Sequence, residues 1–123
     1  MDRLQYQVGC IGENYAAEFL QNSGFTIARR NFRIAGGEID LIAEKEDKIV
    51  FCEVKTRLGS PKTPPHEAVD RKKLYHLHRC ARYYLLQNPA PHAKLSIYVI
   101  AVLLNDDYGL KQIKCYSDVD LDY

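Results

Sequence analysis

The chain has 123 residues, of which 46% are hydrophobic and 27% are charged, and its net charge is +1. This length and composition predict one globular domain, and they exclude a chain that is basic throughout, so any nucleic-acid-binding surface must be local. The first residues lack the apolar run of a secretory signal, and no segment reaches the roughly 20 apolar residues that a bilayer requires. We expect a cytoplasmic protein with no membrane partner.

The first half of the chain predicts one helix and then strands. Apolar residues recur at helical spacing over Gly9–Ser23, which predicts a helix that ends at Gly24. Phe25–Arg33 is predicted as a strand, and Ala35–Gly37 is a turn signal. Four scattered cysteines form no CxxC pair, so we expect small apolar side chains rather than a zinc site: Cys10, Cys52, Cys80 and Cys115.

Two alternating strands follow. Over Glu38–Lys45, period 2 places Ile39, Leu41 and Ala43 on one face and Glu38, Asp40, Ile42 and Glu44 on the other. A short connection leads to a strand over Ile49–Arg57.

The second half predicts one helix and two strands. Leu58–His66 is a Pro-rich loop, and Glu67–Gln87 is an amphipathic helix with the apolar stripe Leu74, Leu77, Ala81, Tyr84 and Leu85. Strands over Leu95–Leu104 and Leu110–Tyr116 flank a polar turn. The order α-β-β-β-α-β-β predicts an α/β fold, with a mixed central sheet of about five strands flanked by helices.

Carboxylates and a lysine are concentrated on the two central strands. Spacing of two residues places Glu53 and Lys55 on one face, and Asp40 on the neighbouring strand can point to the same spot. Two hard oxygen ligands can hold Mg²⁺, and a nearby lysine can position water or stabilise a phosphate. The alternative is a solvated strand face with cross-strand ion pairs.

Glu13 is a third acidic candidate. It lies between Gly9, Gly12 and Ala16, where glycines permit close backbone approach, at the edge of the apolar stripe of the first helix. The alternative is a first-turn glutamate that complements the helix dipole.

Five motifs follow one another in order: Gly9-x-x-Gly12-Glu13-x-x-Ala16, Gly24-Phe25-x-Ile27, Arg30-Asn31-x-Arg33, Gly37-Glu38-Ile39-Asp40-Leu41-Ile42-Ala43 and Phe51-x-Glu53-Val54-Lys55-Thr56-Arg57. From Gly9 to about Leu86 the chain resembles the YraN-like family of small uncharacterised bacterial proteins. That family belongs to the restriction-endonuclease-like, PD-(D/E)xK nuclease superfamily and is similar to archaeal Holliday-junction resolvases. The resemblance implies a restriction-endonuclease-like fold. We expect a single such domain over residues 1–117, followed by an acidic tail over 118–123.

The resemblance also implies roles for single residues. Asp40 and Glu53 match the two metal-binding carboxylates of the superfamily, and Lys55 matches its catalytic lysine. Glu13 matches the helix-one glutamate that joins the metal site in resolvase-like members, and Glu38 has a less defined place, with metal contact through water as one option. The chain departs from the family at residues 96–98, where Ser-Ile-Tyr replaces the usual Arg-Phe-Asp and removes a charged pair.

Basic residues gather in two segments expected beside the acidic site. The predicted second helix carries Arg71, Lys72, Lys73, His76, Arg79 and Arg82, with Tyr75 and Tyr83 among them. A second cluster holds Arg29, Arg30 and Arg33, and Arg57 and Lys62 flank the site. These side chains are expected to contact backbone phosphates with little sequence selectivity, Lys73 through the resemblance. The alternative is a solvated helix face.

We therefore expect a Mg²⁺- or Mn²⁺-dependent nuclease that hydrolyses DNA, with branched DNA as the substrate class implied by the resemblance. A homodimer is expected only by analogy, because resolvases cut two strands symmetrically. The competing hypotheses are a non-catalytic nucleic-acid-binding module and a protein-interaction subunit that keeps the charges without the chemistry.

Overall fold

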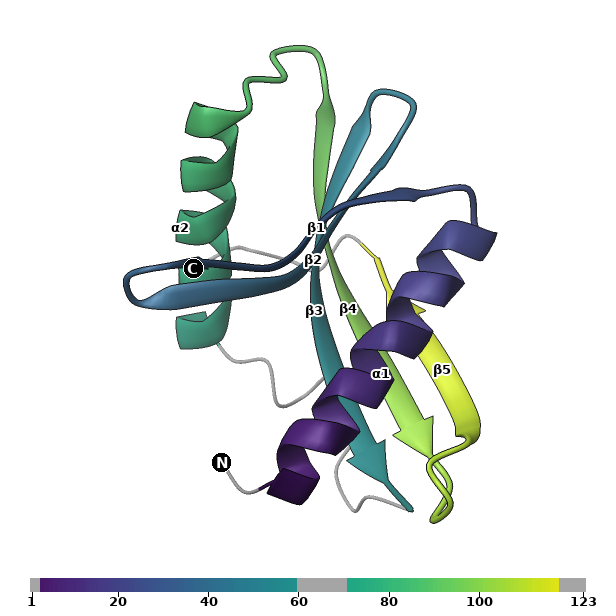
Figure 1. The fold of residues 1–123 in the computed structure, drawn as a ribbon. Coiled ribbons are helices and arrows are strands. Elements are labelled where there is room, and N and C mark those ends of the chain that lie inside the picture. The colour runs from purple at the N-terminus through teal and green to yellow at the C-terminus, as the bar shows by residue number, and fades with distance from the viewer. Residues whose placement is uncertain (1–2, 60–70, 118–123) are drawn as a thin grey trace.

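The computed structural model describes residues 3–59 and 71–117, and Figure 1 shows a twisted sheet with one helix on each side. Its elements are α1 (Arg3–Asn22), β1 (Thr26–Ile34), β2 (Gly37–Lys45), β3 (Lys48–Leu58), α2 (Arg71–Gln87), β4 (Lys94–Leu104) and β5 (Leu110–Tyr116). The predicted tail over 118–123, Lys62 and the predicted helix start at Glu67 lie outside the described residues.

The five strands form one mixed sheet in the order β1-β2-β3-β4-β5. Neighbouring strands are antiparallel except β3 and β4, which pair in parallel from Lys48↔Lys94 to Leu58↔Leu104. A parallel pair requires a crossover connection, and α2 lies within it. The predicted fold class is confirmed: a mixed five-stranded sheet flanked by helices, in the order α-β-β-β-α-β-β.

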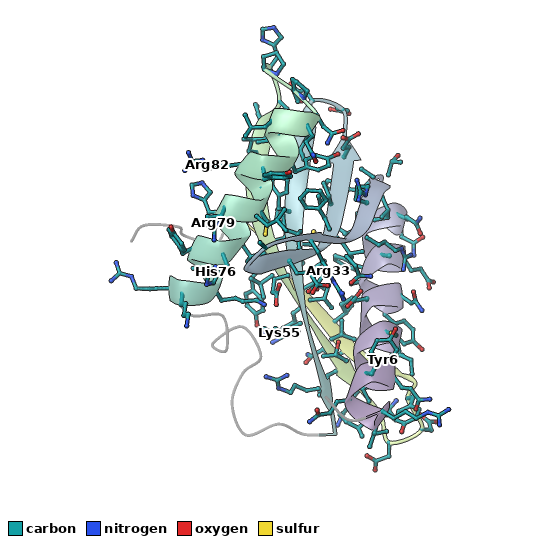
Figure 2. All side chains as sticks on the ribbon, turned by 60° about the vertical axis from the view of Figure 1, so that its left-hand side comes forward. Tyr6, Arg33, Lys55, His76, Arg79 and Arg82 are labelled. Carbon is teal, nitrogen blue, oxygen red and sulfur yellow. The ribbon has the colours of Figure 1, made fainter. Side chains whose placement is uncertain are left out.

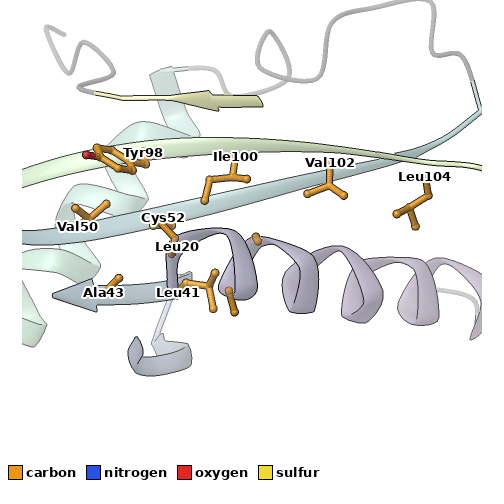
Figure 3. Close-up of a cluster of buried hydrophobic side chains, with 11 residues drawn as sticks. Leu20, Leu41, Ala43, Val50, Cys52, Tyr98, Ile100, Val102 and Leu104 are labelled. Atoms are coloured by element: carbon orange, nitrogen blue, oxygen red, sulfur yellow. The ribbon is translucent and has the colours of Figure 1, made fainter. Parts of the chain in front are cut away.

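Each helix covers a separate core. The α1-side core packs Ala16, Ala17 and Leu20 against the sheet, and Figure 3 shows Leu20 beside Leu41 and Cys52. The α2-side core packs the predicted stripe of α2 onto the opposite face: Leu74, Leu77, Ala81 and Tyr84 with Phe32, Ile42, Phe51 and Ile97. Because both faces are covered, β4 is buried along most of its length, which explains its nearly continuous apolar sequence.

Helix α1 begins at Arg3, six residues before the predicted start at Gly9. Leu4 and Tyr6 are 49% and 63% exposed, so this extension has no buried stripe to announce it. Among the cysteines, Cys52 and Cys80 are buried as expected, whereas Cys10 is exposed on α1. Among the described helices, none is long and apolar enough to cross a membrane.

The alternation predicted for β2 is wrong at Ile39. That side chain is fully buried in the α2-side core with Ile42, instead of joining Leu41 on the other face. The β2–β3 ladder extends only to Leu41↔Cys52, whereas β2 stays paired with β1 back to Gly37. The first residues of β2 are not paired with β3, so their side chains need not alternate between the same two faces as the rest of the sheet. This part of the β1–β2 hairpin extends toward α2 (Figure 1).

The Ser-Ile-Tyr segment fills a structural position without the charged pair. The Tyr98 ring is 9% exposed and packs edge-on against Phe25, with 6.2 Å between the ring centroids. Lys48 Nζ donates a hydrogen bond to the Tyr98 hydroxyl at 2.8 Å. A phenol–lysine contact therefore exists at Tyr98, where the resemblance leads one to expect an aspartate.

Candidate functional site

The candidate site lies where β2 separates from β3. Asp40 is the first β2 residue beyond the β2–β3 ladder. Its Oδ2 accepts a hydrogen bond from the Val54 backbone N–H at 2.7 Å, so a side chain takes the place of the missing ladder partner. This bond places the Asp40 carboxylate against β3 between the positions of Glu53 and Lys55, as the spacing predicted.

Glu53 is a buried carboxylate with two unlike oxygens. Glu53 is only 3% exposed, so its side chain does not belong to a solvated strand face. Oε1 lies 3.4 Å from Lys55 Nζ and 3.3 Å from Lys73 Nζ. Oε2 is buried and has no hydrogen-bond partner within the described part of the chain. A buried, half-satisfied carboxylate is costly in free energy unless a further cation or donor contacts it.

The Asp40 carboxyl holds its proton far above the ordinary range. Burial, followed by the charge of Glu53, raises its pKa from 3.8 to about 8, although the Val54 N–H acts in the opposite direction. The charges of Glu13 and Glu38 raise this pKa further, so four carboxyl groups interact around one region. Without a cation, Asp40 is largely protonated at neutral pH.

Asn31 connects the two outer carboxylates. With its amide nitrogen facing them, it donates to Glu13 Oε1 and to Glu38 Oε1, both at 3.1 Å. Asn31 has φ of 51°, a left-handed conformation that asparagine tolerates better than most residues. Glu38 Oε2 also lies 3.4 Å from Arg33 Nε. The sequence predicted no role for Asn31, although it lies in the Arg30-Asn31-x-Arg33 motif.

Glu13 is half-buried and lies well inside α1, so the first-turn interpretation is wrong. Burial, then the charge of Glu38, raises its pKa, and the Asn31 hydrogen bond lowers it. Its place depends on Gly12, because a Cβ there would overlap the Thr56 hydroxyl of β3. Close approach of α1 to β3 is thus required at Gly12 but not at Gly9, where a Cβ would meet nothing within 4 Å.

A second glycine brings α2 to the site. A Cβ on Gly37 would lie 2.6 Å from Cys80 Sγ and 3.3 Å from the His76 carbonyl oxygen. The start of β2 therefore packs closely on α2, and Lys73 of the same helix contacts Glu53. His76, predicted among the basic residues of this helix that contact phosphates, is half-buried.

The predicted phosphate-binding residues are placed differently from one another. Lys73 is in the site through its contact with Glu53, and Figure 2 shows Lys55 and Arg33 in the space between the two helices. Arg30 is exposed and donates to Asn14 Oδ1 at 2.8 Å. The half-buried Arg57 donates to the Thr56 carbonyl. The other two are exposed on α2: Lys72 and Arg79.

The donor set around Asp40 and Glu53 fits a hard divalent cation. Within residues 3–59 and 71–117, no three carboxylate, histidine or cysteine side chains are already arranged to hold one ion. Mg²⁺ needs only one or two protein carboxylates because it keeps several waters. The unsatisfied Oε2 of Glu53 is the atom that such an ion would contact. Glu13, held by Asn31, stays a prediction as third ligand.

Comparison with known proteins agrees with the motif order. The profile of the uncharacterised protein family UPF0102 matches residues 12–102. A UPF0102 protein of Clostridium acetobutylicum is 40% identical over 117 residues, covering 93% of this chain and 96% of the relative. One from Syntrophomonas wolfei is 40% identical, covering 84% and 90%, and one from Dictyoglomus thermophilum is 34% identical, covering 80% and 84%. The YraN-like resemblance is confirmed, and the chain belongs to the uncharacterised protein family UPF0102.

Proposed function

We propose that this protein is a divalent-metal-dependent nuclease that hydrolyses phosphodiester bonds in DNA. The observation that carries the proposal is the buried Glu53 carboxylate, which has one oxygen between two lysines and the other without a partner among the described residues. Asp40 lies beside it and is held protonated in the absence of a cation. Buried carboxylates with strongly shifted pKa values are typical of functional sites.

Asp40 and Glu53 would hold Mg²⁺ or Mn²⁺, and Glu13 would join them after giving up its contact with Asn31. The bound ion would neutralise the charge that grows on a phosphate and would lower the pKa of water. Ion binding expels the Asp40 proton, so affinity for the ion falls as the pH decreases.

Lys55 has a defined task in this proposal. Its ammonium group is 3.4 Å from Glu53 Oε1, and its side chain is 21% exposed, so it can reach both the site and an incoming phosphate. It would orient the attacking water and donate hydrogen bonds to the phosphate oxygens. During hydrolysis the water oxygen forms a bond to phosphorus, the bond to the leaving sugar oxygen breaks, and that oxygen takes up a proton.

A non-catalytic nucleic-acid-binding module is the second candidate, and one observation favours it. Lys55 and Lys73 already compensate part of the Glu53 charge, so the cluster can be stable without any ion. The two functions differ in whether the site binds a metal and whether bound DNA is cut.

Calorimetric titration with Mg²⁺ and with Mn²⁺ tests the metal site. We expect binding to the natural chain and to Glu44→Gln, which removes an exposed carboxylate from the same strand, and no binding to Asp40→Asn. Incubation of the same proteins and Lys55→Ala with branched, single-stranded and duplex DNA tests the chemistry. Cutting that survives both Asp40→Asn and Lys55→Ala rejects this site as the nuclease centre. If the protein binds DNA but does not cut it in the presence of either metal ion, the result supports the non-catalytic nucleic-acid-binding module instead.

A further inference from the structure

The outer surface of α2 combines positive charge with exposed flat side chains. The helix contains five lysines and arginines and no acidic residue: Arg71, Lys72, Lys73, Arg79 and Arg82. Tyr75 and Tyr83 are 50% and 45% exposed, although large aromatic side chains are usually more deeply buried. The predicted metal site accounts for Lys73 alone, so the remaining residues need another explanation.

Four of these side chains, Tyr75, Arg79, Arg82 and Tyr83, line one surface hollow of about 550 Å³. Tyr75, Arg79, Arg82 and Leu86 follow the spacing i, i+4, i+7 and i+11, which places them on one stripe of the helix. At a rise of about 1.5 Å per residue, the stripe is about 16 Å long. Figure 2 labels Arg79 and Arg82 along α2, and both side chains are exposed.

The two tyrosine rings are held by aromatic neighbours. The Tyr83 ring lies 6.4 Å from the Phe32 ring, measured between centroids, at an interplanar angle of 40°. The Tyr75 ring packs edge-on against the His76 ring at 5.7 Å. Rings that are ordered before binding lose little conformational entropy when a ligand stacks on them.

We propose that this hollow binds single-stranded nucleic acid, with bases stacked on Tyr75 and Tyr83 and phosphates contacted by Arg79 and Arg82. A helix with five basic and no acidic side chains complements a polyanion. Exposed aromatic faces beside arginines are typical of surfaces that bind unpaired bases, because every base offers a π-face. In a duplex those faces are covered by neighbouring base pairs, so the tyrosines select against it.

The same helix connects the hollow with the carboxylate site. Lys73, two residues before Tyr75, reaches Glu53 at 3.3 Å. At the other side, a Cβ on Gly36 would lie 3.5 Å from Arg79 Nη1, so the β1–β2 turn borders the hollow. The substrate is then a nucleic acid with an unpaired segment next to the bond that is cut; this last step rests on the proposed function, whereas binding of the single strand does not.

Fluorescence anisotropy with a labelled dT12 oligonucleotide, in EDTA, measures binding without cleavage. We expect Tyr75→Ala to weaken dT12 binding about tenfold and Tyr75→Trp to retain it. Arg79→Ala and Arg82→Ala should each reduce the slope of log affinity against log salt by about 0.7, whereas Tyr75→Ala leaves the slope unchanged. Leu110→Ala, an exposed apolar residue on β5, is the matched control. A blunt duplex of equal length should bind Tyr75→Ala and the natural chain equally.

Equal affinity of Tyr75→Ala and the natural chain for dT12 overturns this inference. So does light scattering that finds a natural dimer converted to a monomer by Tyr75→Ala, because the hollow would then be an interface between two copies. The test is separate from that of the nuclease. Tyrosine-dependent dT12 binding by a protein that cuts nothing keeps the inference and rejects the nuclease, and cutting with tyrosine-independent binding does the reverse.

Discussion

Replacing Asp40 by asparagine should stabilise the metal-free protein at neutral pH. In the folded chain the pKa of Asp40 is about 8, against an ordinary value of 3.8 that the unfolded chain approaches. Between these values the unfolded chain has lost the proton and the folded chain still holds it. The free energy of unfolding is therefore not reduced by Asp40 below pH 4, and it decreases as the pH rises toward 8.

The size of the effect follows from the pKa difference. From pH 3.8 to pH 7 the pH changes by about 3 units, and each unit is worth about 1.4 kcal/mol, so the free energy of unfolding falls by on the order of 4 kcal/mol. Asparagine cannot ionise, and its carbonyl oxygen can still accept the hydrogen bond from Val54 N–H. The free energy of unfolding of Asp40→Asn should therefore exceed that of the natural chain by this amount at pH 7 and equal it near pH 4.

Urea unfolding followed by circular dichroism, in EDTA, at several values from pH 4 to pH 8 measures this difference. Glu44→Gln is the control, and we expect it to change stability by less than about 0.5 kcal/mol at every pH. Mg²⁺ at about 100 times its dissociation constant should raise the free energy of unfolding of the natural chain by about 3 kcal/mol and leave that of Asp40→Asn unchanged. The reasoning fails if Asp40→Asn gains nothing at pH 7, or if its gain is just as large at pH 4.

Three further predictions concern the packing around the site. Gly12→Ala should lower the free energy of unfolding by about 1–3 kcal/mol because its Cβ overlaps a β3 side chain, whereas Gly9→Ala should raise it by up to about 1 kcal/mol; equal melting temperatures would contradict this. Asn31→Asp places a fifth carboxyl group among four, so its melting temperature should fall at pH 7 and recover at pH 4; a loss that is independent of pH would indicate packing instead. Lys73→Met removes a cation that competes with metal for Glu53, so calorimetry should find tighter Mg²⁺ binding, and weaker binding would show that Lys73 supports the ion.

The fold was predictable because its signals are local and repeated. The apolar stripe of α2 and the alternation over most of β2 and β3 each indicated burial, and the structure buries these side chains accordingly. The turn residues Ala35–Gly37 marked the end of β1 and the start of β2. The prediction was wrong at Ile39, because period 2 assumes that a strand keeps its partners, and β2 pairs with β3 only from Leu41 onward. The start of α1 was missed because its first two turns bury almost nothing.

The site was predictable in its residue types and less so in its contacts. The spacing of Glu53 and Lys55 predicted a shared face, and they do make contact. The bridging amide of Asn31 and the reach of Lys73 to Glu53 could not be predicted, because each joins elements whose mutual position depends on the whole fold. The separate behaviour of Gly9 and Gly12 likewise depends on which turn of α1 crosses Thr56.

The bond between the Asp40 side chain and the Val54 amide gives the protein a built-in sensor. In a regular sheet an amide N–H donates a hydrogen bond to a backbone carbonyl oxygen, which does not titrate. Here the acceptor is a titrating oxygen at 2.7 Å, so the resonance of one backbone nitrogen–proton pair follows the state of the carboxyl group. A ¹⁵N-labelled sample therefore reports proton release, and any cation that causes it, through the single Val54 peak.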